Sequence, residues 1–64
     1  MRLKEARRRA RESWGDRADV ERYANGTHQV GVMREKLFVP YGHGLSFEEA
    51  FADAAKNGFR VKGG

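Results

Sequence analysis

The sequence has no cysteine, one proline and no long apolar run, and each of these absences narrows what the chain can be. Without cysteine, its 64 residues form neither disulfides nor thiolate zinc sites, so packing or a partner must stabilise the fold. No segment approaches the roughly 18 apolar residues of a membrane span, and the N-terminal residues lack the apolar core of a secretory signal. We expect residues 1–64 to form a single small cytoplasmic domain that has no membrane contact and needs no cofactor.

Positive charge is concentrated in the first quarter of the chain. The net charge is +4 and the isoelectric point is near 10.0. Residues 1–17 carry seven basic and three acidic side chains, whereas residues 18–64 carry six of each. Clustered arginine is typical of a protein that binds a polyanion, because guanidinium groups match phosphate oxygens and release counterions. A solvated helix face explains the same cluster equally well, so charge alone leaves both interpretations open.

The first apolar pattern predicts a helix over residues 3–14. Apolar side chains recur there every three or four residues, at Leu3, Ala6, Ala10 and Trp14. The stripe is narrow, so most of the docking energy should come from Trp14, whose ring can bury on the order of 200 Å². Gly15 follows the stripe, as glycine does just past many helix ends.

Asn25-Gly26 predicts a β-hairpin, because both central residues of a type I′ turn need positive φ. An edge strand is expected over residues 19–24 and a second strand over residues 28–33. By parity, His28 shares a face with Val30 and Val32.

A third strand is expected over residues 36–40, ending at Pro40 because proline has no N–H to donate to a ladder. Leu37 and Val39 would point into the core, and Phe38 to the opposite face. Residues 41–44 contain two glycines and predict a loop.

The second helix carries the clearest signals. Ser46 and Glu49 have the spacing of a capping box. Apolar side chains then repeat at helical spacing, at Phe47, Ala50, Phe51, Ala54 and Ala55. We expect a left-handed cap at Asn57-Gly58 with Phe59 folded back on the last turn, and a flexible tail over residues 60–64.

The order α-β-β-β-α predicts an α+β domain, in which two helices cover one face of a three-stranded antiparallel sheet. Such an arrangement is an economical way for so small a chain to bury its aromatic and β-branched side chains together.

Histidine is the candidate for chemistry. RNA is cleaved without metal when its own 2′-hydroxyl attacks the adjacent phosphate, which needs an acid–base group of pKa near 6.5 and cations that stabilise the transition state. His28 beside an arginine surface could supply both, although a hydrogen-bonded structural histidine also fits this position. Nothing in the sequence has the ligand spacing of a metal site or the glycine pattern of a nucleotide-binding loop.

Three segments resemble the HicA-type mRNA interferase toxins, which have the double-stranded-RNA-binding-domain fold. They read Ala24-Asn25-Gly26-Thr27-His28, Phe38-Val39-Pro40-Tyr41-Gly42-His43 and Ala54-Ala55-Lys56-Asn57-Gly58-Phe59. The resemblance covers roughly residues 3–59. It implies a metal-independent endoribonuclease with His28 as the catalytic residue, and an antitoxin that covers the site. Because the second helix is acidic, RNA would lie along residues 3–14.

Three functions therefore compete. The first is this ribonuclease. The second is a non-catalytic module that binds RNA or DNA through the arginine-rich helix or the open sheet face, since the sheet and following helix also resemble the arm-binding domains of phage integrases. The third is a small inhibitor or adaptor whose arginine helix binds an acidic protein. For the nucleic-acid functions we expect RNA rather than DNA, held by Lys4, Arg7, Arg8, Arg11, Arg34 and Lys36.

Overall fold

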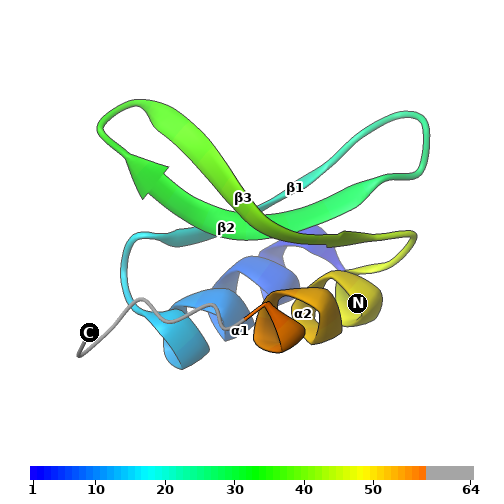
Figure 1. The fold of residues 1–64 in the computed structure, drawn as a ribbon, viewed down its shortest axis with the longest axis horizontal. Helices are drawn as coiled ribbons and strands as arrows, with labels where there is room; N and C mark the ends of the chain where they lie inside the picture. The colour runs from blue at the N-terminus through cyan, green and yellow to red at the C-terminus, as the bar shows by residue number, and fades with distance from the viewer. Residues whose placement is uncertain (58–64) are drawn as a thin grey trace.

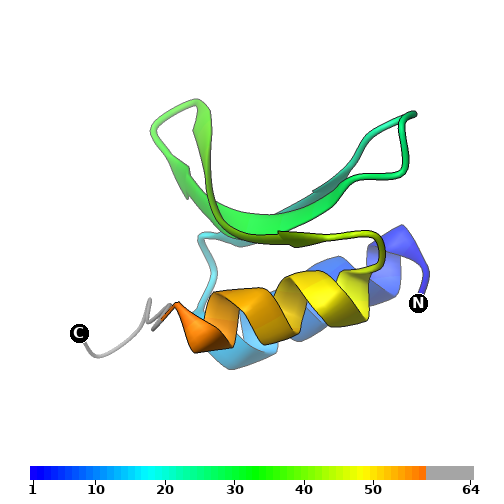
Figure 2. The same cartoon turned by 45° about the vertical axis from the view of Figure 1, so that its right-hand side comes forward.

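The computed structural model describes residues 1–57 and has five elements in the order α-β-β-β-α (Figure 1). They are α1 (Leu3–Trp14), β1 (Ala18–Arg22), β2 (His28–Arg34), β3 (Leu37–Gly44) and α2 (Phe47–Lys56). The strands form one antiparallel sheet in the order β1-β2-β3. Both helices lie against the same face of it (Figure 2), so the predicted α+β class and element order are confirmed. The predicted tail and the position of Phe59 lie outside the described residues.

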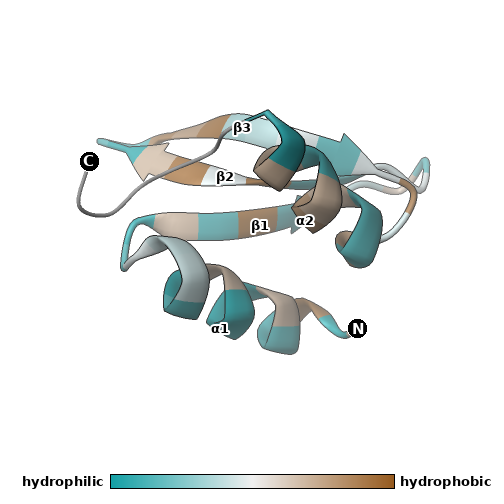
Figure 3. Ribbon diagram, turned by 60° about the horizontal axis from the view of Figure 1, so that its bottom comes forward, coloured by the Kyte–Doolittle hydropathy of each residue, from teal (hydrophilic) through white to brown (hydrophobic). Residues whose placement is uncertain are grey.

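The core fills the space between the helices and the sheet. Helix α1 packs along β1, and α2 packs against β2 and β3 (Figure 3). The buried side chains are small apart from Phe47 and the valines: Ala6, Ala10, Ala18, Val20, Val30, Val32, Phe47, Ala50 and Ala54. The rings of Trp14 and Phe51, with centroids 5.4 Å apart, join the two helices above this layer. Helix α1 therefore docks through alanines and one half-buried tryptophan, as its narrow stripe predicts.

The first hairpin forms where it is predicted, but its turn is of a different type. Strand β1 ends at Arg22, and only Gly26 of the Asn25-Gly26 pair has positive φ, at 93°. The Gly26 N–H donates to Tyr23 O, and the Tyr23 N–H donates to Thr27 O. This is a three-residue loop with glycine in its left-handed position, not a type I′ turn. The Asn25 side chain accepts from the Thr27 N–H and so stabilises the loop.

The prediction that β3 ends at Pro40 is wrong. The strand continues to Gly44, with Gly31 opposite Pro40 and Val30 opposite Gly42. Tyr41 is thus the extra residue of a bulge, and a proline is tolerated at a bulge on an edge strand. The expectation that Leu37 points into the core is also wrong, because it lies at the hairpin tip and is 72% exposed.

The predicted loop at residues 41–44 is instead the part of β3 that α2 covers most closely. A Cβ on Gly42 would lie 2.4 Å from Ala50 O, and one on Gly44 would lie 2.5 Å from Glu49 Cβ. These two glycines let the helix backbone approach the strand. Ser46 caps α2 as predicted, accepting from the Glu49 N–H. Of the predicted left-handed cap at Asn57-Gly58, Asn57 has a φ of −81° and Gly58 lies outside the described residues. Within residues 1–57, neither helix is long and apolar enough to cross a membrane.

Candidate nucleic-acid interface

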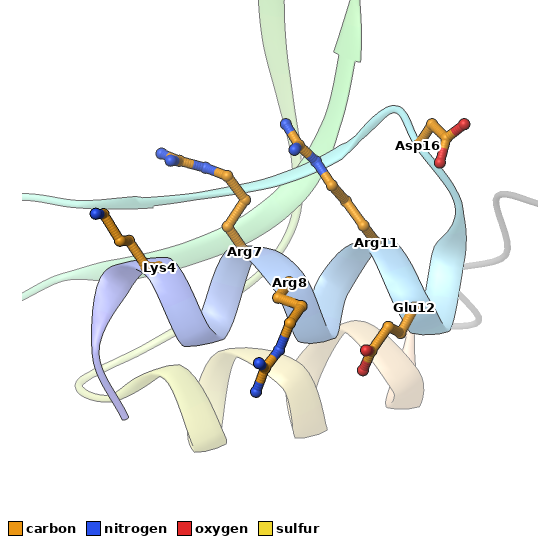
Figure 4. A pocket seen from close by; sticks show the side chains of 6 residues that line it. All are labelled: Lys4, Arg7, Arg8, Arg11, Glu12 and Asp16. Carbon is orange, nitrogen blue, oxygen red and sulfur yellow. The ribbon is translucent and has the colours of Figure 1, made fainter.

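Four of the five basic side chains of α1 are neighbours on the helix surface. Lys4, Arg7, Arg8 and Arg11 occupy positions i, i+3, i+4 and i+7, which are neighbours on a helix surface. They line a groove of about 530 Å³ together with two acidic residues, Glu12 and Asp16 (Figure 4). Four of the six predicted phosphate-binding residues are therefore brought together, and we call this surface the α1 groove.

Two of these arginines are tied to β1. Arg7 Nε donates to Asp19 Oδ1 at 2.8 Å, and Arg11 Nε makes a long contact of 3.4 Å with Ala18 O. Asp19 Oδ1 also accepts from the Val20 N–H at 2.8 Å. Figure 4 shows the side chains of Arg7 and Arg11 reaching from α1 to β1, whereas Arg8 points away from the sheet. The guanidinium groups of Arg7 and Arg11 thus lie on the β1 side of the groove, and that of Arg8 lies on the side away from the sheet.

Three of the four basic side chains in the α1 groove have no ion-pair partner among residues 1–57, although Glu12 and Asp16 line the same groove. Arg7 pairs with Asp19, and the neighbouring Arg9, outside the groove, pairs with Glu5 at 3.7 Å. Within residues 1–57, no carboxylate lies at ion-pair distance from Lys4, Arg8 or Arg11. Four basic side chains against Glu12, Asp16 and the Asp19 that pairs with Arg7 leave a local net charge of +1, so attraction of an anion depends on the three basic side chains without an ion pair.

The two remaining predicted residues lie elsewhere. Arg34 ends β2 and Lys36 lies in the β2–β3 turn, and neither lines the α1 groove. An Nη2 atom of Arg34 lies 3.4 Å from the Tyr41 hydroxyl. Their role in binding stays a prediction. Because they lie outside the α1 groove, they would have to contact a different part of the ligand.

His28 lies on the helix-covered face of the sheet, as its parity with Val30 predicts. Its ring meets Phe47 edge-on, with centroids 4.6 Å apart and an interplanar angle of 89°. Its Nδ1 lies 2.8 Å from Gly26 O, and because a carbonyl only accepts, Nδ1 is the protonated nitrogen. These contacts give His28 a role in joining the first hairpin to the core. Its acid–base role stays a prediction, since the α1 groove does not include it.

The sheet face that the helices leave uncovered is less suited to phosphate. Along β1 it presents Asp19 and Glu21, whose side chains alternate with the buried Ala18 and Val20. Glu21 accepts from the Tyr23 hydroxyl at 2.6 Å, which raises the pKa of Tyr23 above its usual 10.0 because the hydrogen bond favours the neutral phenol.

Acidic side chains of α2 make hydrogen bonds within the fold. Glu49 accepts from the Leu45 N–H, and Asp53 accepts from the His43 N–H at 3.0 Å and lies 3.4 Å from His43 Nδ1. The capping box predicted at Ser46 and Glu49 includes a backbone bond of this kind for Glu49, whereas the contacts of Asp53 and Asp19 were not predicted. Only the alternation of Asp19 with buried neighbours hinted that it points away from the core, and nothing local placed it beside α1.

Among the residues that the structure describes, no group of three or more histidine and carboxylate side chains is placed to hold a metal ion. Comparison of the chain with family models, with curated proteins and with solved structures gives no match.

Proposed function

We propose that the protein binds the phosphate backbone of a nucleic acid along the α1 groove. The observation that carries the proposal is the set of three basic side chains, Lys4, Arg8 and Arg11, that share this groove and have no carboxylate at ion-pair distance among residues 1–57. Contacts to phosphate orient a protein on its ligand but carry no direct sequence information. The groove therefore supports binding that tolerates many sequences.

RNA is the nucleic acid that we expect. The α-β-β-β-α order is that of the double-stranded-RNA-binding domains, and duplex RNA is recognised mainly by shape and backbone contacts. Three neutralised phosphates correspond to a slope of about −2.7 for log affinity against log salt on a duplex. Raising salt from about 50 to 200 mM should then weaken binding by roughly 40-fold.

The test is fluorescence anisotropy with labelled duplex RNA, duplex DNA and single-stranded RNA, in EDTA at several salt concentrations. The first variant removes the three unpaired charges of the groove: Lys4→Gln, Arg8→Gln and Arg11→Gln. The matched control removes three exposed charges elsewhere and gives the same net charge: Arg9→Gln, Arg22→Gln and Lys56→Gln.

We expect the groove variant to lose most of the affinity and the salt dependence, and the control to lose little. Equal losses in the two variants would show attraction by net charge alone, without a defined surface. Absence of binding to every probe would overturn the proposal and favour an acidic protein as the partner. Running the RNA samples on a gel with a His28→Ala variant tests cleavage separately, because loss of binding and loss of cleavage are then measured independently.

A further inference from the structure

We infer that Asp19 is a positioning residue for phosphate binding, because it holds Arg7 in the orientation in which its guanidinium group takes a phosphate oxygen. This inference rests on the proposed function. It is unexpected on charge alone, since a carboxylate next to a phosphate site should repel the ligand.

The geometry around Asp19 carries the inference. Its Oδ1 atom accepts two hydrogen bonds of 2.8 Å, one from its neighbour Val20 N–H and one from Arg7 Nε. The first bond fixes the carboxylate against its own strand. The second fixes the long side chain of Arg7 through its inner nitrogen, which leaves the outer end of the guanidinium fork to extend along the groove (Figure 4).

Burial makes this tie more than a loose surface pair. The Asp19 side chain is 22% exposed and that of Arg7 is 38% exposed, so both are partly buried where Arg7 reaches from α1 to β1. A free arginine loses much rotational freedom when it binds phosphate, whereas one held at Nε has already lost it. Arg11 is tied in the same way but more weakly, through its long contact with Ala18 O.

The other acidic residues of the groove provide an internal comparison. Glu12 and Asp16 line the same surface. Within residues 1–57, neither of them has a hydrogen bond or ion pair to a groove cation. They should therefore act only by repulsion, and their neutralisation should strengthen binding.

The experiment measures the affinity for the same duplex RNA of the wild type, Asp19→Asn and Glu12→Gln, each checked for folding by circular dichroism melts. Both substitutions raise the net charge by one. We expect Glu12→Gln to strengthen binding and Asp19→Asn to weaken it by about two- to tenfold, the range for one immobilised side chain.

An Arg7→Ala background separates positioning from a structural effect. In that background Asp19 has no arginine to hold, so Asp19→Asn should strengthen binding as Glu12→Gln does. Tighter binding by Asp19→Asn in the wild-type background would overturn the inference, because Asp19 would then compete with phosphate for Arg7. A loss that persists in the Arg7→Ala background would overturn it too. If the wild type binds no nucleic acid, it is the proposed function that fails.

Discussion

The close approach of α2 to β3 predicts that Gly42→Ala strongly destabilises the protein. A Cβ at Gly42 would lie 2.4 Å from both Ala50 O and Ala54 N, and 2.7 Å from Ala54 Cβ. Two of these atoms belong to the helix backbone, so no side-chain rotation relieves the clash and α2 must move as a body. The φ of Gly42 is not positive, so the backbone itself would accept alanine and the penalty is steric.

The magnitude follows from two opposing effects. Overpacking of this kind costs about 1–3 kcal/mol, and backbone contacts place Gly42→Ala near the upper end. The substitution also lowers the conformational entropy of the unfolded chain, which offsets about 0.4–1 kcal/mol of this cost. The net loss is about 2 kcal/mol, a large part of the stability of a chain this small. It corresponds to a fall in melting temperature of roughly 10 °C.

Trp14 provides the assay, because it is the single tryptophan and its ring contacts Phe51 of α2. Urea unfolding followed by its fluorescence, alongside circular dichroism, reports on helix packing and on secondary structure. The control is Gly26→Ala, where a Cβ meets nothing within 4 Å and only the positive φ of 93° is strained. That strain should cost about 1 kcal/mol. An unchanged or higher urea midpoint of unfolding for Gly42→Ala would refute the close packing of α2 on β3.

Three further predictions concern single positions. Glu35→Gly should raise the free energy of unfolding by about 0.5 kcal/mol in a urea titration, because Glu35 has a left-handed φ of 58° that glycine adopts without strain. Ser46→Ala should lower it by about 1 kcal/mol in the same assay, since the capping bond to the Glu49 N–H is lost. In an ultraviolet pH titration Tyr23 should ionise above its usual 10.0, and Glu21→Gln should lower this pKa because the anionic acceptor is removed; an unchanged titration would contradict the Tyr23–Glu21 bond.

The helices and the hairpin could be predicted because their signals are local. The apolar spacing of α1 predicts the observed bounds, residues 3–14, and Ser46 marks the start of α2. Each of these signals acts through neighbours in the sequence, so no knowledge of the fold is needed.

The extent of β3 could not be predicted, because its cause is distant in the sequence. Pro40 and the glycines after it read locally as the end of a strand and a loop. They belong to the strand because a bulge accommodates Tyr41 and because the backbone of α2 needs a surface without Cβ atoms. The second requirement exists only once α2 has folded onto the sheet.

The candidate site likewise has one part that was predictable from local sequence and one part that depends on the fold. Its charges are local, so the sequence predicts that Lys4, Arg7, Arg8 and Arg11 lie together. The tie between Arg7 and Asp19 spans two elements and depends on α1 running along β1. For that reason the composition of the groove was predictable, whereas the orientation of its arginines was not.

Both outer strands of the sheet have backbone groups occupied by side chains of the adjacent helix. Asp53 binds the outward N–H of His43, Asn57 donates to Tyr41 O, and Arg11 contacts Ala18 O. An unpaired strand edge is a template on which another chain can add a strand and begin aggregation. Here a foreign strand would first have to displace these side chains, so the helices restrict the growth of the sheet as well as covering its core.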